Sequence, residues 1–210
     1  MDKAPKSLQG RKLYIPQMSY EGARCMAAAF QSVGFEAEPS PPGNSQTYEL
    51  ARKYLSGDEC LPQAVTLGNF LQVTQQPGFD PSKTAFLMPT SNGPCRFGHY
   101  LHLTNKIFHD SAFKDVLVFS MSSADGYQSI GKAARELFRT GWRAVLVSDI
   151  LRKMLFKTRP YENTPGATDK VFHNSLDRVC KALATPEISH TRRLKVLIKA
   201  LVDSRDEFKS

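Results

Sequence analysis

Long apolar runs are missing from this sequence of 210 residues, and their absence excludes several classes of protein. No stretch approaches the ~20 consecutive apolar residues that a transmembrane helix needs. The first residues, MDKAPKSLQGRK, are polar and lack the apolar centre of a secretory signal peptide. Only four cysteines are present, scattered rather than closely paired, which is not the pattern of a secreted disulfide framework. We therefore expect a cytoplasmic protein that does not enter a membrane.

The short motifs of several common enzyme classes are also missing. The sequence contains no Gly-x-Gly-x-x-Gly fingerprint, no Walker loop, no Gly-x-Ser-x-Gly elbow and no His-Glu-x-x-His pair. These motifs place backbone amides against phosphates, expose a nucleophilic serine or hold a catalytic zinc ion. Nucleotide hydrolysis and serine hydrolysis by this chain therefore have no support in the sequence.

Charge is distributed unevenly along the chain, which has a net charge of +8. Residues 1–129 contain 11 Lys and Arg against 11 Asp and Glu, whereas residues 130–210 contain 17 against 9. A basic region of this kind can bind nucleic acid or another polyanion. Aromatic residues are not interleaved with the charges, as they are on single-strand binding surfaces. We therefore interpret the charges as exposed helix faces beside an acidic neighbour, and nucleic acid is not an expected partner.

Short apolar segments alternate with amphipathic ones, and this rhythm predicts an α/β fold. Strands are expected at 12–16, 35–38, 84–88 and 116–119. Uninterrupted apolar strands indicate a parallel sheet that is covered on both faces, with right-handed crossovers. The predicted order is 2-1-3-4, a short Rossmann-like sheet with flanking helices and its topological switch between the first and third strands.

Apolar residues at helical spacing predict the helices that flank this sheet. They are expected at about 21–33, 47–55, 61–73, from 130 through 143–149, 168–184 and 187–207. The resulting organisation is a disordered tail at 1–10, a Rossmann-like α/β domain at 11–160 and a helical extension at 161–210 that leads into a second domain. The last helix has one narrow apolar stripe, part of which we expect to be exposed. Its members are Leu194, Leu197, Ile198, Leu201 and Val202.

Ligands of open parallel sheets collect beyond the carboxyl ends of the strands. Three loops are predicted at that edge, namely 17–20, 89–100 and 120–126. They carry polar side chains that we expect to contact a ligand. These side chains are Ser19, Asn92, Arg96 and Ser122.

Two cysteines are each predicted at the start of a helix. Cys95 follows a Gly-Pro turn, and Cys60 is followed by Leu-Pro, where the proline suits a first helical turn. The positive end of the helix dipole would favour thiolate over thiol, and Arg96 would add to this effect at Cys95. Two such thiolates could jointly hold a soft metal or an iron–sulfur cluster. The alternative is that both are small buried hydrophobic residues.

Two histidines and two further cysteines complete the set of candidate metal ligands. His99 and His102 follow Cys95 at four and seven residues, so with the two helix-start cysteines they could form a CysCysHisHis zinc site. A histidine pair on a helix surface more often has no ligand. Cys25 and Cys180 lie on the apolar faces of predicted helices, and we expect both in the core.

Five segments of the sequence together resemble one family of proteins. They read YLSGDECLP at 54–62, TLGNF at 66–70, PTSNGPCRFGHY at 89–100, TRPYE at 158–162 and PGATD at 165–169. The family comprises proteins related to the iron–sulfur component of 2-hydroxyacyl-CoA dehydratases, also called CoA-substrate-specific enzyme activases. The resemblance spans about residues 11–185, and GPCRFG and ECLP are its most specific elements.

This resemblance implies a Rossmann-like half of a larger protein that holds a [4Fe–4S] cluster. An ATP-hydrolysing activase domain or subunit would feed low-potential electrons to that cluster, which would support chemistry on an acyl-CoA substrate. Cys60 and Cys95 match cluster-ligand cysteines by position. Ser19 stands where family members often have a further cysteine, and only Cys180 follows Cys95. The alternative function is therefore a binding or assembly module of the same fold without the cluster.

Overall fold

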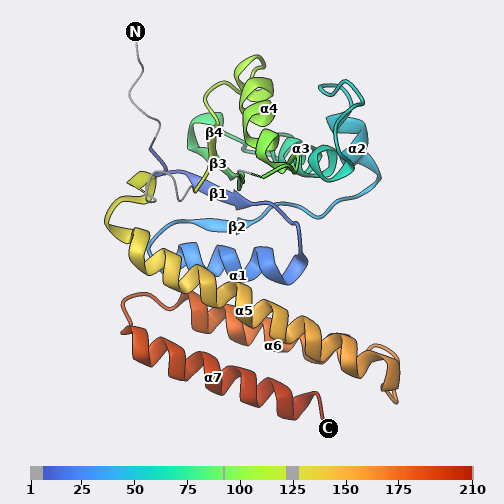
Figure 1. Cartoon of the computed structure of the whole chain (residues 1–210), viewed down its shortest axis with the longest axis vertical. Helices are drawn as coiled ribbons and strands as arrows, with labels where there is room; N and C mark the ends of the chain where they lie inside the picture. The colour runs from blue at the N-terminus through green and yellow to red at the C-terminus, as the bar shows by residue number, and fades with distance from the viewer. Residues whose placement is uncertain (1–6, 92, 122–127, 210) are drawn as a thin grey trace. The chain divides into compact units, whose positions relative to one another are not determined.

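Four short strands form one parallel sheet in a computed structural model that describes residues 7–91, 93–121 and 128–209 (Figure 1). The strands are β1 (Lys12–Ile15), β2 (Ala37–Pro39), β3 (Thr84–Leu87) and β4 (Leu117–Phe119). Their order is β2-β1-β3-β4, which confirms the predicted Rossmann-like sheet. Leu13 of β1 lies opposite Ala85 of β3, so the topological switch is where the sequence places it.

Contacts divide the chain into two compact units. One consists of residues 1–20 and 35–134 and contains the sheet, and the other consists of residues 21–34 and 135–210 and is helical. Most of the first helix thus belongs with the helices of the carboxyl-terminal third. The boundaries expected at residues 10 and 160 concern independently folding domains and stay predictions.

The core of the sheet unit forms where helices α3 (Leu61–Thr74) and α4 (Phe97–His109) pack on one face of the sheet (Figure 1). Phe70 of α3 stacks on Phe86 of β3 with ring centroids 4.3 Å apart, and Phe108 of α4 lies 5.4 Å from the same ring. Every residue of β3 is buried. A continuous apolar strand therefore does occupy the sheet interior, as expected for parallel pairing.

Helix α2 (Ser45–Ala51) packs very closely on α3. A Cβ atom added to Gly68 would lie 2.0 Å from the carbonyl oxygen of Thr47, so only glycine fits at this crossing. The helix begins with a capping box between Asn44 and Thr47. It ends four residues earlier than predicted, because the Tyr54 amide bonds to the Ala51 carbonyl in a tight turn.

One arginine ties the amino-terminal edge of the sheet together. The guanidinium of Arg11 donates to the carbonyl oxygens of Pro81, Thr84 and Asp115 at 3.1, 3.0 and 2.9 Å. These carbonyls precede or begin the two strands that follow β1 in the sheet order. In the segment before Arg11, Leu8 is buried.

The helical unit contains most of α1 (Tyr20–Gln31) and α5 (Ala134–Thr158), with α6 (Ala167–Ala184) and α7 (His190–Glu207). Segment 143–149 lies inside α5, which confirms the helical interpretation of its apolar spacing. Arg193 of α7 is only 1% exposed, and it donates to the carbonyl oxygens of Leu183 and Thr185 at 2.5 and 2.7 Å. Its guanidinium thereby caps the carboxyl end of α6.

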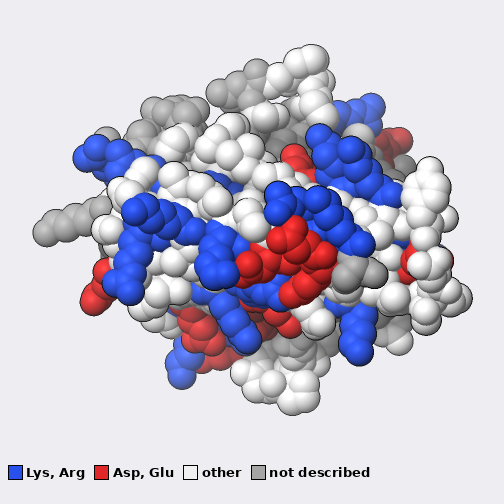
Figure 2. Space-filling model, turned by 90° about the horizontal axis from the view of Figure 1, so that it is seen from below, with Lys and Arg blue, Asp and Glu red and all other residues white. Residues whose placement is uncertain are grey.

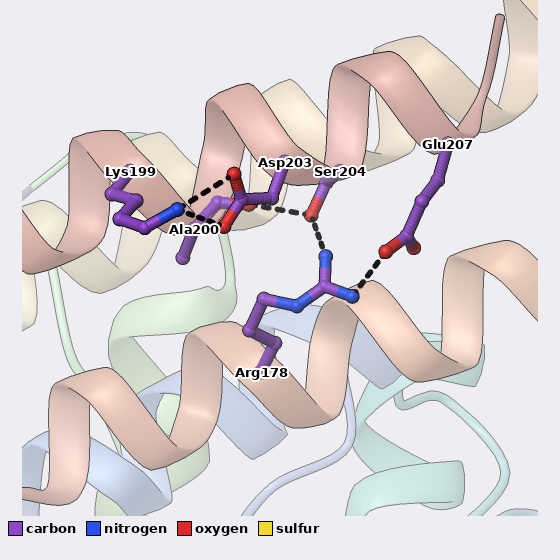
Figure 3. A network of polar contacts seen from close by, with 6 residues as sticks. All are labelled: Arg178, Lys199, Ala200, Asp203, Ser204 and Glu207. Atoms are coloured by element: carbon purple, nitrogen blue, oxygen red, sulfur yellow. Dashed lines mark hydrogen bonds and ion pairs between the residues drawn. The ribbon is translucent and has the colours of Figure 1, made fainter.

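A polar network joins α6 to α7 (Figure 3). Arg178 donates to the hydroxyl of Ser204 at 3.2 Å and forms an ion pair with Glu207. The Ser204 hydroxyl in turn donates to the carbonyl oxygen of Ala200 at 2.7 Å. Lys199 pairs with Asp203 along the outer face of α7. Some of the basic side chains on these helices are therefore neutralised by ion pairs within the unit.

The surface of the helical unit is mixed in charge. Acidic side chains lie between the basic ones on the face seen from the side of α7, rather than leaving one continuous basic patch (Figure 2). The apolar stripe of α7 is partly exposed, as expected: Leu197 is 2% exposed, but Leu194 is 41% and Ile198 is 53% exposed. Within residues 7–91, 93–121 and 128–209, no helix combines the length and the apolar character needed to cross a bilayer.

Candidate functional site

Cys60 stands at the start of α3, as predicted. It is the N-cap residue in an extended conformation, and Pro62 lies in the first turn. The side chain is partly buried and packs against the core cluster that includes Tyr100. The thiol therefore sits at the junction between the helix amino terminus and the apolar core.

Cys95 precedes α4 by two residues and is exposed. The loop that carries it folds tightly over the first turn of the helix. A Cβ atom added to Gly98 would lie 2.6 Å from the carbonyl oxygen of Ser91, so glycine permits this close approach. The hydroxyl of Thr90 also donates to the Gly98 carbonyl at 3.4 Å.

The two cysteine loops meet at one edge of the sheet unit. Arg96 donates from its guanidinium to the carbonyl oxygen of Asp58 at 2.7 Å, which links residues 38 positions apart. Tyr100 in α4 belongs to the core cluster against which Cys60 packs. Burial raises the pKa of Tyr100, and Cys60 raises it further through charge and a side-chain hydrogen bond, while Cys95 contributes through charge. The backbone of Gln63 has the opposite effect and lowers the pKa of Tyr100.

Tyr100 is the residue at this site that sequence reasoning missed. It is 5% exposed, and its ring packs edge-on against Phe97 with centroids 5.2 Å apart. Its position three residues after Phe97 marks it as a core residue of an amphipathic helix. Nothing in that local pattern indicates that Tyr100 shares a core cluster with a cysteine 40 residues earlier.

The other predicted contact residues differ in their outcomes. Ser19 is partly buried in the loop between β1 and α1. Arg96 is exposed and spans the two cysteine loops. Asn92 and Ser122 lie outside the described residues. His99 and His102 are exposed on α4.

A pocket of about 370 Å³ opens beside the Cys60 loop. Tyr48 and Arg52 of the α2 region line it, together with Glu59 and Leu61. Glu59 accepts hydrogen bonds from the amides of Ser56 and Gly57 at 3.2 and 3.0 Å. Slight desolvation raises the pKa of Glu59, but these bonds outweigh it and hold the pKa below its usual value. The carboxylate therefore fixes the loop that leads into Cys60.

Metal binding needs more ligands than this cluster provides. Among the residues that the structure describes, no group of three or more His, Cys, Asp or Glu side chains could hold a metal ion. The zinc site expected from Cys60, Cys95 and the α4 histidines is therefore not assembled in that part of the chain. A [4Fe–4S] cluster is held by four cysteine thiolates. The two thiols here fit half of such a site and not a complete one.

Neither the protein-family models, nor the curated proteins, nor the solved structures contain a match to this chain. The family indicated by the five sequence segments therefore stays a prediction.

Proposed function

We propose that this chain supplies two ligands, Cys60 and Cys95, to a [4Fe–4S] cluster that a partner polypeptide completes. In this proposal the chain is the Rossmann-like half of an iron–sulfur protein of the 2-hydroxyacyl-CoA dehydratase and activase type. Its partner is an ATP-hydrolysing activase domain or subunit that delivers low-potential electrons. The substrate of the complete assembly would be an acyl-CoA.

One observation carries the proposal: the hydrogen bond of 2.7 Å from the Arg96 guanidinium to the Asp58 carbonyl oxygen joins the loop that carries Cys95 to the loop that leads into Cys60. The two cysteines are 35 positions apart, one at the N-cap of α3 and the other two residues before α4, so the meeting of their loops is a property of the fold. Cys95 is exposed, which a packing role does not explain. An exposed thiol beside a partly buried one suits ligands that face an interface.

The surrounding residues would act by positioning the two thiols. The Arg96 bond to the Asp58 carbonyl holds the loops at a fixed separation before any ligand binds. Tyr100 belongs to the core cluster against which Cys60 packs, and the groups that surround a sulfur ligand tune the potential of iron–sulfur sites. A bound cluster would supply one-electron chemistry, and this chain would supply its orientation.

Anaerobic reconstitution tests the proposal. The chain is mixed with ferrous iron, sulfide and a small exogenous thiol that can stand in for the missing ligands, and is then separated from free iron by gel filtration. We expect iron and sulfide to be retained by the wild-type chain and by the control variant Cys180→Ser. Retention should fall at least tenfold in Cys60→Ser and in Cys95→Ser. The proposal would be refuted if the wild-type chain retained no iron, or if neither substitution lowered the amount of iron retained.

The second candidate is a binding or assembly module without a cluster. Two observations favour it. The site offers only two of the four cysteine ligands that a cluster needs, and α5 carries exposed apolar residues at a spacing of four. Trp142, Leu146 and Ile150 are 62%, 48% and 39% exposed. Such a ridge is typical of a protein-interaction surface. A chain that retains no iron but loses a binding partner on Trp142→Ala would support the module.

A further inference from the structure

Two cysteines that the sequence assigns to the core face each other in the helical unit. Cys25 of α1 is 0% exposed, and Cys180 of α6 is partly exposed. Their sulfur atoms are 3.9 Å apart, within thiol hydrogen-bond distance. They are 155 positions apart in the sequence, so their proximity arises only from the packing of α1 on α6.

A second contact fixes the register of the same two helices. Arg24, the neighbour of Cys25, forms an ion pair with Asp177 at 2.6 Å. Asp177 and Cys180 are three residues apart and share one face of α6. The ion pair and the thiol pair therefore lie side by side across one helix interface, which keeps the sulfur atoms close while the thiols are reduced.

We propose that Cys25 and Cys180 are a peroxide-sensitive dithiol that closes into a disulfide between α1 and α6. Cys180 is the attacking thiol because it is the more accessible of the two. Its sulfur takes one peroxide oxygen, the O–O bond breaks and the leaving hydroxide takes a proton to give water. Cys25 then attacks the Cys180 sulfenic acid, and the S–O bond breaks to release a second water. The balance is two thiols and one hydrogen peroxide to one disulfide and two waters.

The local electrostatics agree with this order of events. The hydrogen bond with Cys25 lowers the pKa of Cys180. Burial and the charge of Asp177 raise this pKa, whereas the charge of Arg24 lowers it further. The same hydrogen bond, together with burial, raises the pKa of Cys25. A thiolate is the form of cysteine that reacts with peroxide, and a lower pKa favours it at the accessible Cys180. The buried Cys25 stays a thiol until it attacks the oxidised Cys180.

Disulfide closure should require only small side-chain movements. A disulfide joins its sulfur atoms at about 2.0 Å, which is about 2 Å less than their present separation. Both residues lie on helices in contact rather than on opposed loops. The link would close a long loop and would hold α1 against α6 covalently.

The test uses the full chain with Cys60→Ser and Cys95→Ser, so that only the proposed pair remains and the iron–sulfur proposal plays no part. The reduced chain is treated with one equivalent of hydrogen peroxide, and free thiols are then alkylated. Intact-mass measurement should show a chain lighter by two hydrogen atoms with no alkylation. Peptide mapping should identify a Cys25–Cys180 link that a dithiol reductant reverses.

Single substitutions in the same background assign the two roles. Cys25→Ala should stop the reaction at a Cys180 sulfenic acid, which a sulfenic-acid reagent traps. Cys180→Ala should leave the buried Cys25 unoxidised under the same conditions. The yield of the intramolecular link should fall at least tenfold when the chain is treated in urea. Oxygen added to one cysteine without a link, a link between two chains, or no reaction at peroxide levels that fully oxidise glutathione would each overturn the proposal.

Discussion

Replacement of Gly68 by alanine tests the contact that sets α2 against α3. The new Cβ atom would lie 2.0 Å from the Thr47 carbonyl oxygen, whereas ordinary contact begins near 3.4 Å, so about 1.4 Å of movement is needed. Thr47 cannot easily move. It shares a capping box with Asn44, and Gln72 of α3 donates to its hydroxyl at 2.9 Å.

The magnitude follows from two opposed effects. Overpacking costs about 1–3 kcal/mol, and the upper end applies because the obstacle is anchored backbone. Alanine in a helix interior recovers about 1 kcal/mol relative to glycine. We therefore expect Gly68→Ala to lower the free energy of unfolding by about 2 kcal/mol. With a denaturant dependence on the order of 2 kcal/mol per molar, the urea midpoint should fall by about 1 M.

Gly141→Ala is the matched control, because it makes the same change in the interior of α5. Its Cβ atom would meet the Met26 sulfur at 3.6 Å, which is ordinary contact, so the propensity gain of about 1 kcal/mol should remain. Urea unfolding followed by circular dichroism compares both variants with the wild type. Fluorescence of the one tryptophan, Trp142, follows the helical unit separately. A Gly68→Ala chain as stable as the wild type would show that the two helices separate at little cost.

Three further predictions concern the helical unit. Arg193→Met keeps the side-chain stem but removes the donors to two helix-end carbonyls, so urea unfolding should show a loss of about 2–3 kcal/mol. Glu162 accepts bonds from the amides of Gly166 and Thr168, which lower its pKa below 4.5. The stabilisation that the ionised Glu162 gives the fold is thus complete above about pH 4.5 and is lost as the pH falls through the folded-state pKa. In an acid titration of stability, Glu162→Gln should lack this pH-dependent loss. The oxidised Cys25–Cys180 form, which closes a loop of 155 residues, should be more stable than the reduced form by up to about 5 kcal/mol, and equal thermal midpoints would contradict this.

The order of the sheet and the start of α3 could be predicted from local sequence patterns. In the strand Thr84–Leu87 the three residues after Thr84 are apolar and lie on both faces, which suits the interior of a parallel sheet. Pro62 after Cys60 marks the first turn of α3, since proline lacks the amide that a helix start leaves unpaired. Such signals are local, because each depends on residues within a few positions of one another.

The contacts between distant side chains could not be predicted in this way. The hydrogen bond from Arg96 to Asp58, the burial of Arg193 at the end of α6 and the approach of Cys25 to Cys180 all join distant parts of the chain. The spacing of apolar residues shows that Cys180 faces inward but not what it faces. Partners across a helix interface depend on the position and register of both helices in space. A periodic sequence pattern fixes neither of these.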